Sequence, residues 1–359
     1  RMVHDDFVAD MSAFVRSRNP RATIFYNKGH IGPAHRPIQD AYTHFELESL
    51  PSGGWGYQHF PITMRYARTL DLPCVSHTGK FHTTWGDFHS FKNPEALQFE
   101  CFRMIAMGCR CEVGDQMEPR GVLSPAVYDL VGGVYAEVEK KEPWCFPSVP
   151  VSDMAVLTPE AFAPATVRTD LPDAIQGANQ MLEELGHQFD IVDPEADFGR
   201  YRVLILPDCI PVNAALKEKL ESYLAQGGAL LLSHESGLTP DKAGFALDTG
   251  LSYKGPAAAY RDFLMPTQTL GRDLPATEHT MYLRAAQVEA RDAQVLSWTY
   301  GAWFDRTWEH FCSHQHAPSI GQPAYPGIAR KGNIVYFSHP VFTIYRLNAP
   351  RWCRSFVRD

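Results

Sequence analysis

The chain of 359 residues lacks the sequence features that mark several common classes of protein. It has no GxGxxG run and no P-loop, so nucleotide binding is not supported. No internal repeat and no low-complexity tract is present. The formal net charge of -8 gives no basic surface for nucleic acid or for an anionic membrane, so we expect neither partner and favour a neutral small molecule.

The eight cysteines lack the regular spacing of a disulfide framework, and we interpret them as mostly free thiols of a reducing compartment. The first residue is Arg1, and neither an initiator methionine nor a signal peptide is present. Apolar residues from Val3 to Val15 have helical spacing. We therefore expect the sequence to begin partway through a domain, which leaves the compartment open, with the cytoplasm favoured.

What the sequence does contain is an alternation of helical and strand-like segments over residues 1–148. Proline and glycine separate the segments, and each strand-like run leads into a polar loop. This order predicts the C-terminal half of a (β/α)8 barrel, units five to eight, with a complete open doubly wound sheet as the alternative. The expected strands are Ala22–Asn27, Tyr42–Ser49, Leu72–His77 and Cys109–Gly114, and the expected helices after the first are Phe60–Thr69, Pro94–Met107 and Pro125–Lys141.

Residues 149–250 read as a second domain with a flavodoxin-like parallel α/β layer. Its strands are continuous apolar runs, as parallel sheets buried on both faces require. The expected strands are Met154–Leu157, Phe189–Val192, Tyr201–Pro207 and Ala229–Ser233, and the expected helices are Leu171–Leu185 and Asn213–Gln226.

Residues 251–359 form a third, β-rich segment in this interpretation. Short strand-like pieces, Thr280–Leu283, Gln294–Thr299 and Asn333–Ser338, stand between proline and glycine residues. They either complete the sheet of the second domain or form a small sandwich.

The stretch Tyr42–Tyr57, YTHFELESLPSGGWGY, carries the strongest indication of function. Side chains alternate along a strand, so Glu46 and Glu48 point to the same face. Aromatic residues follow the glycines at the end of that strand, and an aromatic ring beside a carboxylate suits a sugar. We predict these glutamates as catalytic residues of a carbohydrate site; a solvated strand face is the alternative.

Charged and aromatic residues gather on the loops that follow the expected strands. Because such loops lie together at the carboxyl end of a barrel, we expect them to bind the hydroxyl groups and ring of a sugar. No cofactor and no metal is expected. The predicted substrate-binding residues are Asn27, His30, Trp55, Tyr57, Lys80, His82, Trp85, Asp87 and Asp115.

Two long runs resemble a known family. FELESLPSGGWGY, followed by QFECFRMIAMGCRCEVGDQMEPRG and a helix ending in KKEPWC, resembles the C-terminal half of the barrel of α-L-fucosidases, glycoside hydrolase family 29 and more closely the related family 151. The resemblance implies a retaining exo-glycosidase and places Glu46 at the acid/base, with Phe45 in place of a tryptophan. A difference of one residue in spacing leaves Glu48 as a substitute. The aspartate nucleophile of the fourth strand would precede Arg1, so this segment alone is expected to be inactive.

The run from LGHQFDIVDPE to LLLSHESGL resembles the trimerisation domain of family 42 β-galactosidases. This resemblance implies a homo-oligomer, with a trimer as the expected state. The resemblance to α-L-fucosidases implies a fucoside or related glycoside as the substrate. A non-catalytic carbohydrate-binding or assembly protein with a degenerate barrel is the competing interpretation.

Three further patterns have weaker functional interpretations. The run from Trp308 to His316, WEHFCSHQH, is rich in metal-binding side chains but matches no zinc spacing, so a structural loop is favoured over a metal or sugar site. Cys109 and Cys111 are interpreted as buried packing rather than redox chemistry. Cys209 would have to be the nucleophile of an amidotransferase-like enzyme, but no glycine-flanked elbow surrounds it.

Overall fold

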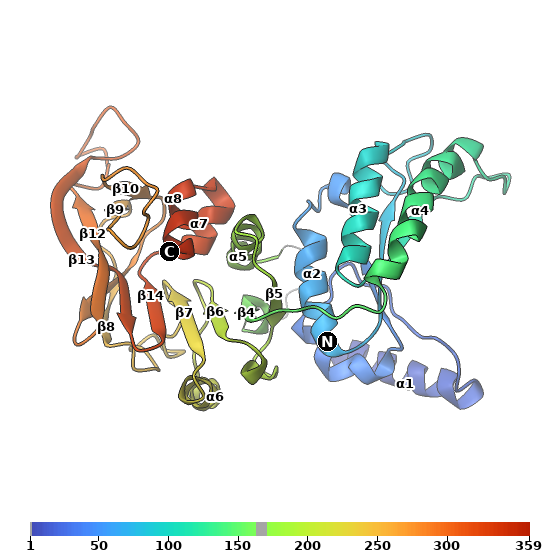
Figure 1. The fold of residues 1–359 in the computed structure, drawn as a ribbon, viewed down its shortest axis with the longest axis horizontal. Coiled ribbons are helices and arrows are strands. Elements are labelled where there is room, and N and C mark those ends of the chain that lie inside the picture. The colour runs from blue at the N-terminus through green and yellow to red at the C-terminus, as the bar shows by residue number, and fades with distance from the viewer. Residues whose placement is uncertain (1, 163–170) are drawn as a thin grey trace. The chain divides into compact units, whose positions relative to one another are not determined.

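The computed structural model describes residues 2–162 and 171–359, which divide into two compact units (Figure 1). The described residues up to Val151 form the first unit, and those from Ser152 onward form the second. Both contain parallel strands and helices, so the chain has a mixed α/β fold. None of the described helices is long and apolar enough to cross a membrane.

The first unit is built on a three-stranded parallel sheet in the order β1-β2-β3. A 17-residue helix, α1 (Met2–Arg18), precedes the sheet and confirms the helical start expected from the sequence. The strands are β1 (Phe45–Glu48), β2 (Cys74–Gly79) and β3 (Arg110–Gly114), and they alternate with α2 (His59–Ala67), α3 (Pro94–Ala106) and α4 (Pro125–Cys145).

One face of this sheet is apolar and packs on helices. Phe45 and Leu47 of β1 are completely buried. Cys111 and Val113 of β3 pack against the core that α3 and α4 share. Because side chains alternate along a strand, the residues between them project from the opposite face. The sheet therefore presents a polar face that consists of side chains from all three strands.

The expected first strand, Ala22–Asn27, is not a strand in the structure. Its link to the sheet is an isolated parallel bridge between Lys28 and Leu47. The backbone N–H of Ile24 donates to the Thr43 hydroxyl (2.7 Å), and its carbonyl accepts from the Thr43 N–H (2.9 Å). The Thr43 side chain thus replaces a backbone hydrogen-bond partner that a neighbouring β-strand would provide. The sheet therefore has three strands where four were expected.

The second unit contains a nine-stranded mixed sheet. Five parallel strands lie in the order β5-β4-β6-β7-β14, and their interior side chains form one large apolar core. All five of these strands match their sequence predictions to within two residues. The first four along the chain are β4 (Met154–Leu157), β5 (Phe189–Val192), β6 (Val203–Leu206) and β7 (Ala229–Ser233). The helices α5 (Asp173–Glu184) and α6 (Ala214–Ala225) follow β4 and β6.

The fifth parallel strand, β14 (Ile334–Phe337), comes from the C-terminal segment and pairs with β7. From β14 the sheet continues in antiparallel order through β13, β12, β9 and β10. The C-terminal segment thus extends the sheet of the preceding residues, which is one of the two arrangements expected. Its other strands are β8 (Leu251–Pro256), β9 (Asp262–Leu264), β10 (His279–Met281), β11 (Ala286–Ala290), β12 (Gln294–Ala302) and β13 (Ser319–Lys331).

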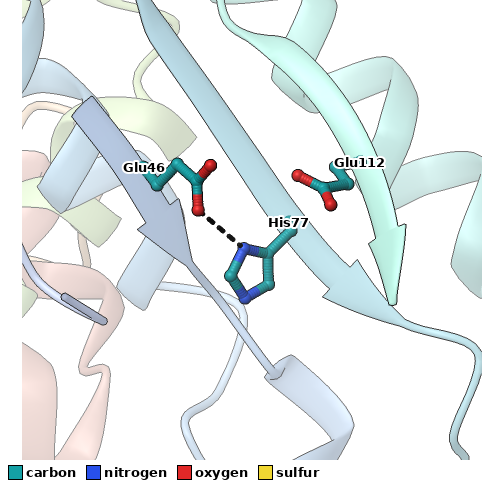
Figure 2. Close-up of side chains that lie close together, drawn as sticks. All are labelled: Glu46, His77 and Glu112. Carbon is teal, nitrogen blue, oxygen red and sulfur yellow. Dashed lines mark ion pairs between the residues drawn. The ribbon is translucent and has the colours of Figure 1, made fainter. Parts of the chain in front are cut away.

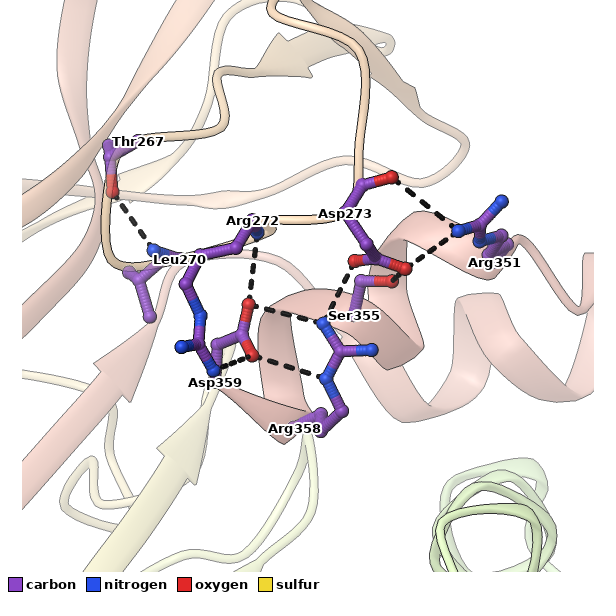
Figure 3. Close-up of polar contacts among 8 residues, drawn as sticks. All are labelled: Thr267, Leu270, Arg272, Asp273, Arg351, Ser355, Arg358 and Asp359. Carbon is purple, nitrogen blue, oxygen red and sulfur yellow. Dashed lines mark hydrogen bonds and ion pairs between the residues drawn. The ribbon is translucent and has the colours of Figure 1, made fainter.

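Ion pairs fix the last helix of the second unit, α8 (Arg351–Arg358), which follows α7 (Val341–Asn348) (Figure 3). Asp273 accepts hydrogen bonds from Arg351 (2.7 Å) and Arg358 (2.8 Å). These guanidinium groups hold the pKa of the Asp273 carboxyl well below its usual range. The network connects α8 to the loop before β10.

Candidate active site

The polar face of the first sheet brings together Glu46, Glu48, His77 and Glu112. Parallel pairing aligns Glu48 with His77 and His77 with Glu112, so three strands contribute to one row near their carboxyl ends. Glu46 lies two residues earlier on β1. Figure 2 shows Glu46, His77 and Glu112 projecting from neighbouring strands toward one another. Parallel α/β folds bind ligands at this end of the sheet.

His77 lies between the two predicted catalytic glutamates. Its Nδ1 is 3.9 Å from Glu46 Oε2, and its Nε2 is 3.5 Å from Glu48 Oε2. A second histidine, His44, has its Nε2 3.8 Å from Glu46 Oε1. One imidazole thus lies within ion-pair distance of both carboxylates.

The environment of Glu46 raises the pKa of its carboxyl. Its side chain is largely buried, and burial raises the pKa of the Glu46 carboxyl, with the negative charge of Glu112 acting in the same direction. His77 and His44 oppose this effect, but the net shift is upward. A glutamate that keeps its proton more readily than usual suits a general acid.

Trp85 lies over the ends of β2 and β3, beside this polar row. Its ring centroid is 6.0 Å from that of His77 and 5.1 Å from that of Phe81. A Cβ atom at Gly114 would lie 2.2 Å from the indole, so the absence of a side chain there makes room for Trp85. Nearly half of the tryptophan side chain is exposed, which leaves ring surface for a ligand.

Lys80 and Asp115 follow β2 and β3 and approach each other. Lys80 is buried, with its Nζ 3.8 Å from Asp115 Oδ1 and 3.4 Å from the Asp87 carbonyl. The Asp87 carboxylate accepts from the backbone N–H of Thr84 (3.2 Å) and thereby stabilises its own loop. The structure thus gives Lys80 and Asp87 roles in holding this loop.

Trp55 and His30 form a separate aromatic cluster with His59 of α2. The Trp55 ring is 4.9 Å from that of His59, and His30 is 6.0 Å from the same ring. His30 Nδ1 is also within 2.7 Å of the Thr63 hydroxyl. The indole of Trp55 covers Gly29, where a Cβ atom would lie 2.7 Å from it.

Tyr57 belongs to the helix-covered side of the sheet. Its hydroxyl donates to Glu100 Oε1 (3.4 Å), whose other oxygen accepts from Thr78 and from Lys92 (2.6 Å each). Thr78 is adjacent to His77 in the strand and therefore projects from the opposite face. Tyr57 is thus grouped with a buried ion pair and not with Glu46. The remaining predicted residues, Asn27 and His82, have exposed side chains.

Sequence reasoning missed three residues of the polar face: His44, His77 and Glu112. His77 and Glu112 lay inside strands that were correctly expected, so alternation alone could have assigned each to one of two faces. The register between strands, which brings them opposite Glu48, is a tertiary feature.

The weaker patterns have different surroundings. Local desolvation and the charges of Asp208 and Glu235 raise the pKa of the Cys209 thiol to about 11, whereas a nucleophilic cysteine needs a lowered value. Of the two cysteines expected to be buried, Cys109 is buried and Cys111 is partly buried against the core of α3 and α4. In the histidine-rich run, His310 packs on Phe304 and His316 on Phe263. Among the described residues, the group able to converge on a metal is instead Glu46, His77 and Glu112.

The fold is similar to that of β-galactosidases of known structure. A β-galactosidase of Bacillus circulans sp. alkalophilus has a TM-score of 0.65 at 13% identity over 89% of this chain and 50% of its own. The β-galactosidase Gan42B has a TM-score of 0.68 at 15% identity, over 93% of this chain and 54% of its own. At these identities the likeness concerns the fold alone.

The predicted resemblance to α-L-fucosidases is confirmed. The chain is similar to α-L-fucosidase isoenzyme 2 from Paenibacillus thiaminolyticus, with 36% identity and a TM-score of 0.95 over 100% of this chain and 55% of that protein. The chain therefore spans little more than half the length of this relative. Residues 161–253 match the β-galactosidase trimerisation domain. A comparison with curated protein sequences gives no significant match.

Proposed function

We propose that this chain carries the acid/base half of a retaining, exo-acting glycosidase of the α-L-fucosidase type. The observation that carries the proposal is the convergence of Glu46, Glu48, His77 and Glu112 on the polar face of β1–β3, beside the exposed ring of Trp85. The similarity to an α-L-fucosidase over the whole chain supports an L-fucoside or a related glycoside as substrate.

Glu46 is the acid/base in this proposal. It protonates the glycosidic oxygen as the bond to the leaving group breaks, and then accepts a proton from the water that attacks the glycosyl-enzyme. Its raised pKa and its position between two histidines fit both steps. Glu48 lies one row further along and contacts the other nitrogen of His77, so it orients the imidazole.

The nucleophile of this proposal is an aspartate upstream of this sequence, on a barrel strand that the chain does not contain. Two observations support an incomplete barrel: the chain covers 55% of its α-L-fucosidase relative, and its first sheet has three strands with one polar face. In the same proposal these strands belong to the C-terminal half of a (β/α)8 barrel. The 359 residues alone are then inactive as a glycosidase.

We also propose that the second unit assembles the protein as a homotrimer. Its parallel strand order, β5-β4-β6-β7-β14, is flavodoxin-like, and the trimerisation-domain match covers the helices α5 and α6. Sedimentation equilibrium of the 359-residue chain measures the assembly directly. A mass of three chains is the expected result, and a monomer at every concentration would contradict this part of the proposal.

The catalytic proposal is tested with a chain extended to include the upstream barrel strands, assayed on an aryl α-L-fucoside whose poor leaving group needs a proton to depart. Glu46→Gln should lower kcat/KM by about a hundredfold or more. Glu48→Gln is the matched control, because it lies on the same strand and face, and should lower it less. An extended chain that binds L-fucose without turnover would instead indicate the non-catalytic carbohydrate-binding alternative. If neither variant reduces turnover, the assignment of this face is wrong.

A further inference from the structure

We propose that Glu46, His77 and Glu112 form a binding site for a divalent transition-metal ion such as Zn²⁺. The three residues each come from a different strand of one sheet, and their ligand atoms all lie within 4.8 Å of one another (Figure 2). This site does not depend on the proposed glycosidase activity, because it is defined by the side chains alone.

The spacing of the ligand atoms is close to what an ion requires. Zinc–nitrogen and zinc–oxygen bonds are about 2.0–2.2 Å long, which places tetrahedral ligand atoms roughly 3.4 Å apart. The present separations of up to 4.8 Å close to that value if the carboxylates move inward by about an ångström, which glutamate side chains achieve by small rotations. The sheet itself need not move.

The negative charges of the site also favour binding of a cation. Glu46 and Glu112 repel each other, and the described ion-pair partners of Glu46 and Glu48 are histidines rather than lysine or arginine. A divalent ion between two carboxylates would replace this repulsion with attraction to both.

Glu48 is placed to accept a hydrogen bond from the second ring nitrogen of His77, as carboxylates near metal-binding histidines usually do. When His77 binds an ion through the nitrogen that faces Glu46, its other nitrogen lies 3.5 Å from Glu48 Oε2. A carboxylate that accepts the second ring N–H fixes the tautomer and the orientation of the imidazole. The structure thus contains three ligands and one carboxylate that orients the histidine.

One imidazole and two carboxylates define the class of ion. Imidazole favours Zn²⁺ and other transition ions, whereas Mg²⁺ and Ca²⁺ prefer ligand sets made of oxygen alone. Three protein ligands leave a fourth position for water or a substrate oxygen. An ion held by Glu46 prevents that carboxyl from delivering a proton, so it would inhibit any reaction that uses Glu46 as an acid.

Isothermal titration of the 359-residue chain with Zn²⁺ tests the proposal without any assay of activity. One strong site per chain is expected in the wild type. His77→Gln and Glu112→Gln should each weaken it by about tenfold or more, and Glu48→Gln by about tenfold, as the loss of an outer partner does. Mg²⁺ should give no comparable heat.

His310→Gln is the control variant, since His310 is also in a histidine-rich run but packs on Phe304 outside the proposed site. It should leave the affinity for Zn²⁺ unchanged. Circular dichroism of every variant checks that the fold is retained. Equal Zn²⁺ affinity in wild type, His77→Gln and Glu112→Gln would overturn the proposal, and so would loss of the strong site in His310→Gln. Inactivity of the extended chain as a glycosidase would leave the Zn²⁺ result unaffected.

Discussion

The two sheets with parallel strands differ in what they place on their faces. In the second unit, the side chains of β5 are buried without exception, and the interior of β4, β6 and β7 is apolar. In the first unit, β1 alternates between buried Phe45 and Leu47 and the two glutamates. Parallel sheets are ordinarily covered on both faces by apolar packing, so a row of Glu and His is a departure from that rule. In our proposal, the apolar sheet serves stability and the polar face of the first sheet serves binding.

The largest effect on stability is expected at the buried pair of Lys92 and Glu100 beneath the first sheet. Their side chains are 2% and 3% exposed, and their charged atoms lie 2.6 Å apart. Glu100→Ala leaves the Lys92 ammonium buried without its partner and should lower the free energy of unfolding by about 3–5 kcal/mol. Chemical denaturation measures the change.

Glu95→Ala, in the exposed first turn of the same helix, is the control for this pair and should cost under about 1 kcal/mol. Lys92→Met combined with Glu100→Leu removes both charges and should recover most of the loss. Equal destabilisation by Glu95→Ala and Glu100→Ala would show that the pair has no special role.

A core substitution in the second sheet tests whether the two sheets contribute differently to stability. Leu204 of β6 is completely buried in the large apolar core, so Leu204→Ala should destabilise the protein by about 2–5 kcal/mol. Glu48→Gln, on the polar face of the first sheet, should change the unfolding free energy by under about 1 kcal/mol. Comparable losses in the two variants would contradict the view that the polar face is not built for stability.

A smaller effect is expected where Gly114 makes room for Trp85. Gly114→Ala should displace the indole, because the new methyl would lie 2.2 Å from it, and should shift the Trp85 resonance in a fluorotryptophan NMR spectrum. Gly132→Ala, in helix α4 with no heavy atom near the added methyl, is the control. It should stabilise the protein by about 0.5–1 kcal/mol and leave that resonance in place.

The smallest effect concerns pH and the Asp273 network of the second unit. The depressed pKa of the Asp273 carboxyl contributes stability that is present above its unfolded value near about 4 and is lost as the pH falls toward the folded value. Asp273→Asn should therefore lower Tm at neutral pH but have little effect at low pH, where the wild-type carboxyl takes up its proton. The exposed guanidinium partners make the difference shrink in concentrated salt, and an equal loss at both pH values would exclude the linkage.

The sequence predicts those features of the structure that depend on local residues, and it does not predict those that depend on tertiary contacts. Continuous apolar runs such as Met154–Leu157 and Phe189–Val192 identify their strands to the residue, because burial on both faces leaves a local signal. Ala22–Asn27 has a similar composition but forms no strand, since Thr43 satisfies its backbone. Strand β14 joins the parallel sheet from about 100 residues beyond β7, a distance that only tertiary pairing determines.

The same distinction holds for the site. Alternation predicts that Glu46 and Glu48 share a face, and the structure places them there. Tyr57, expected beside them, instead bonds Glu100 on the other side of the sheet. His77 and Glu112 enter the site through strand register, for which the sequence holds no local signal. Residues selected because they lie on loops after strands therefore predict where the site is, but they do not predict well which side chains form it.

The most direct test of the central claim is how the loss of kcat/KM in the Glu46→Gln variant depends on the leaving group of the substrate. The measurement compares kcat/KM of the extended chain and its variant on fucosides with good and poor aryl leaving groups. A lost general acid should hardly matter when the leaving group departs without a proton and should cost about a hundredfold or more when it needs one. The account predicts a loss that grows as the leaving group worsens. A loss equal for all leaving groups would contradict Glu46 as the acid/base.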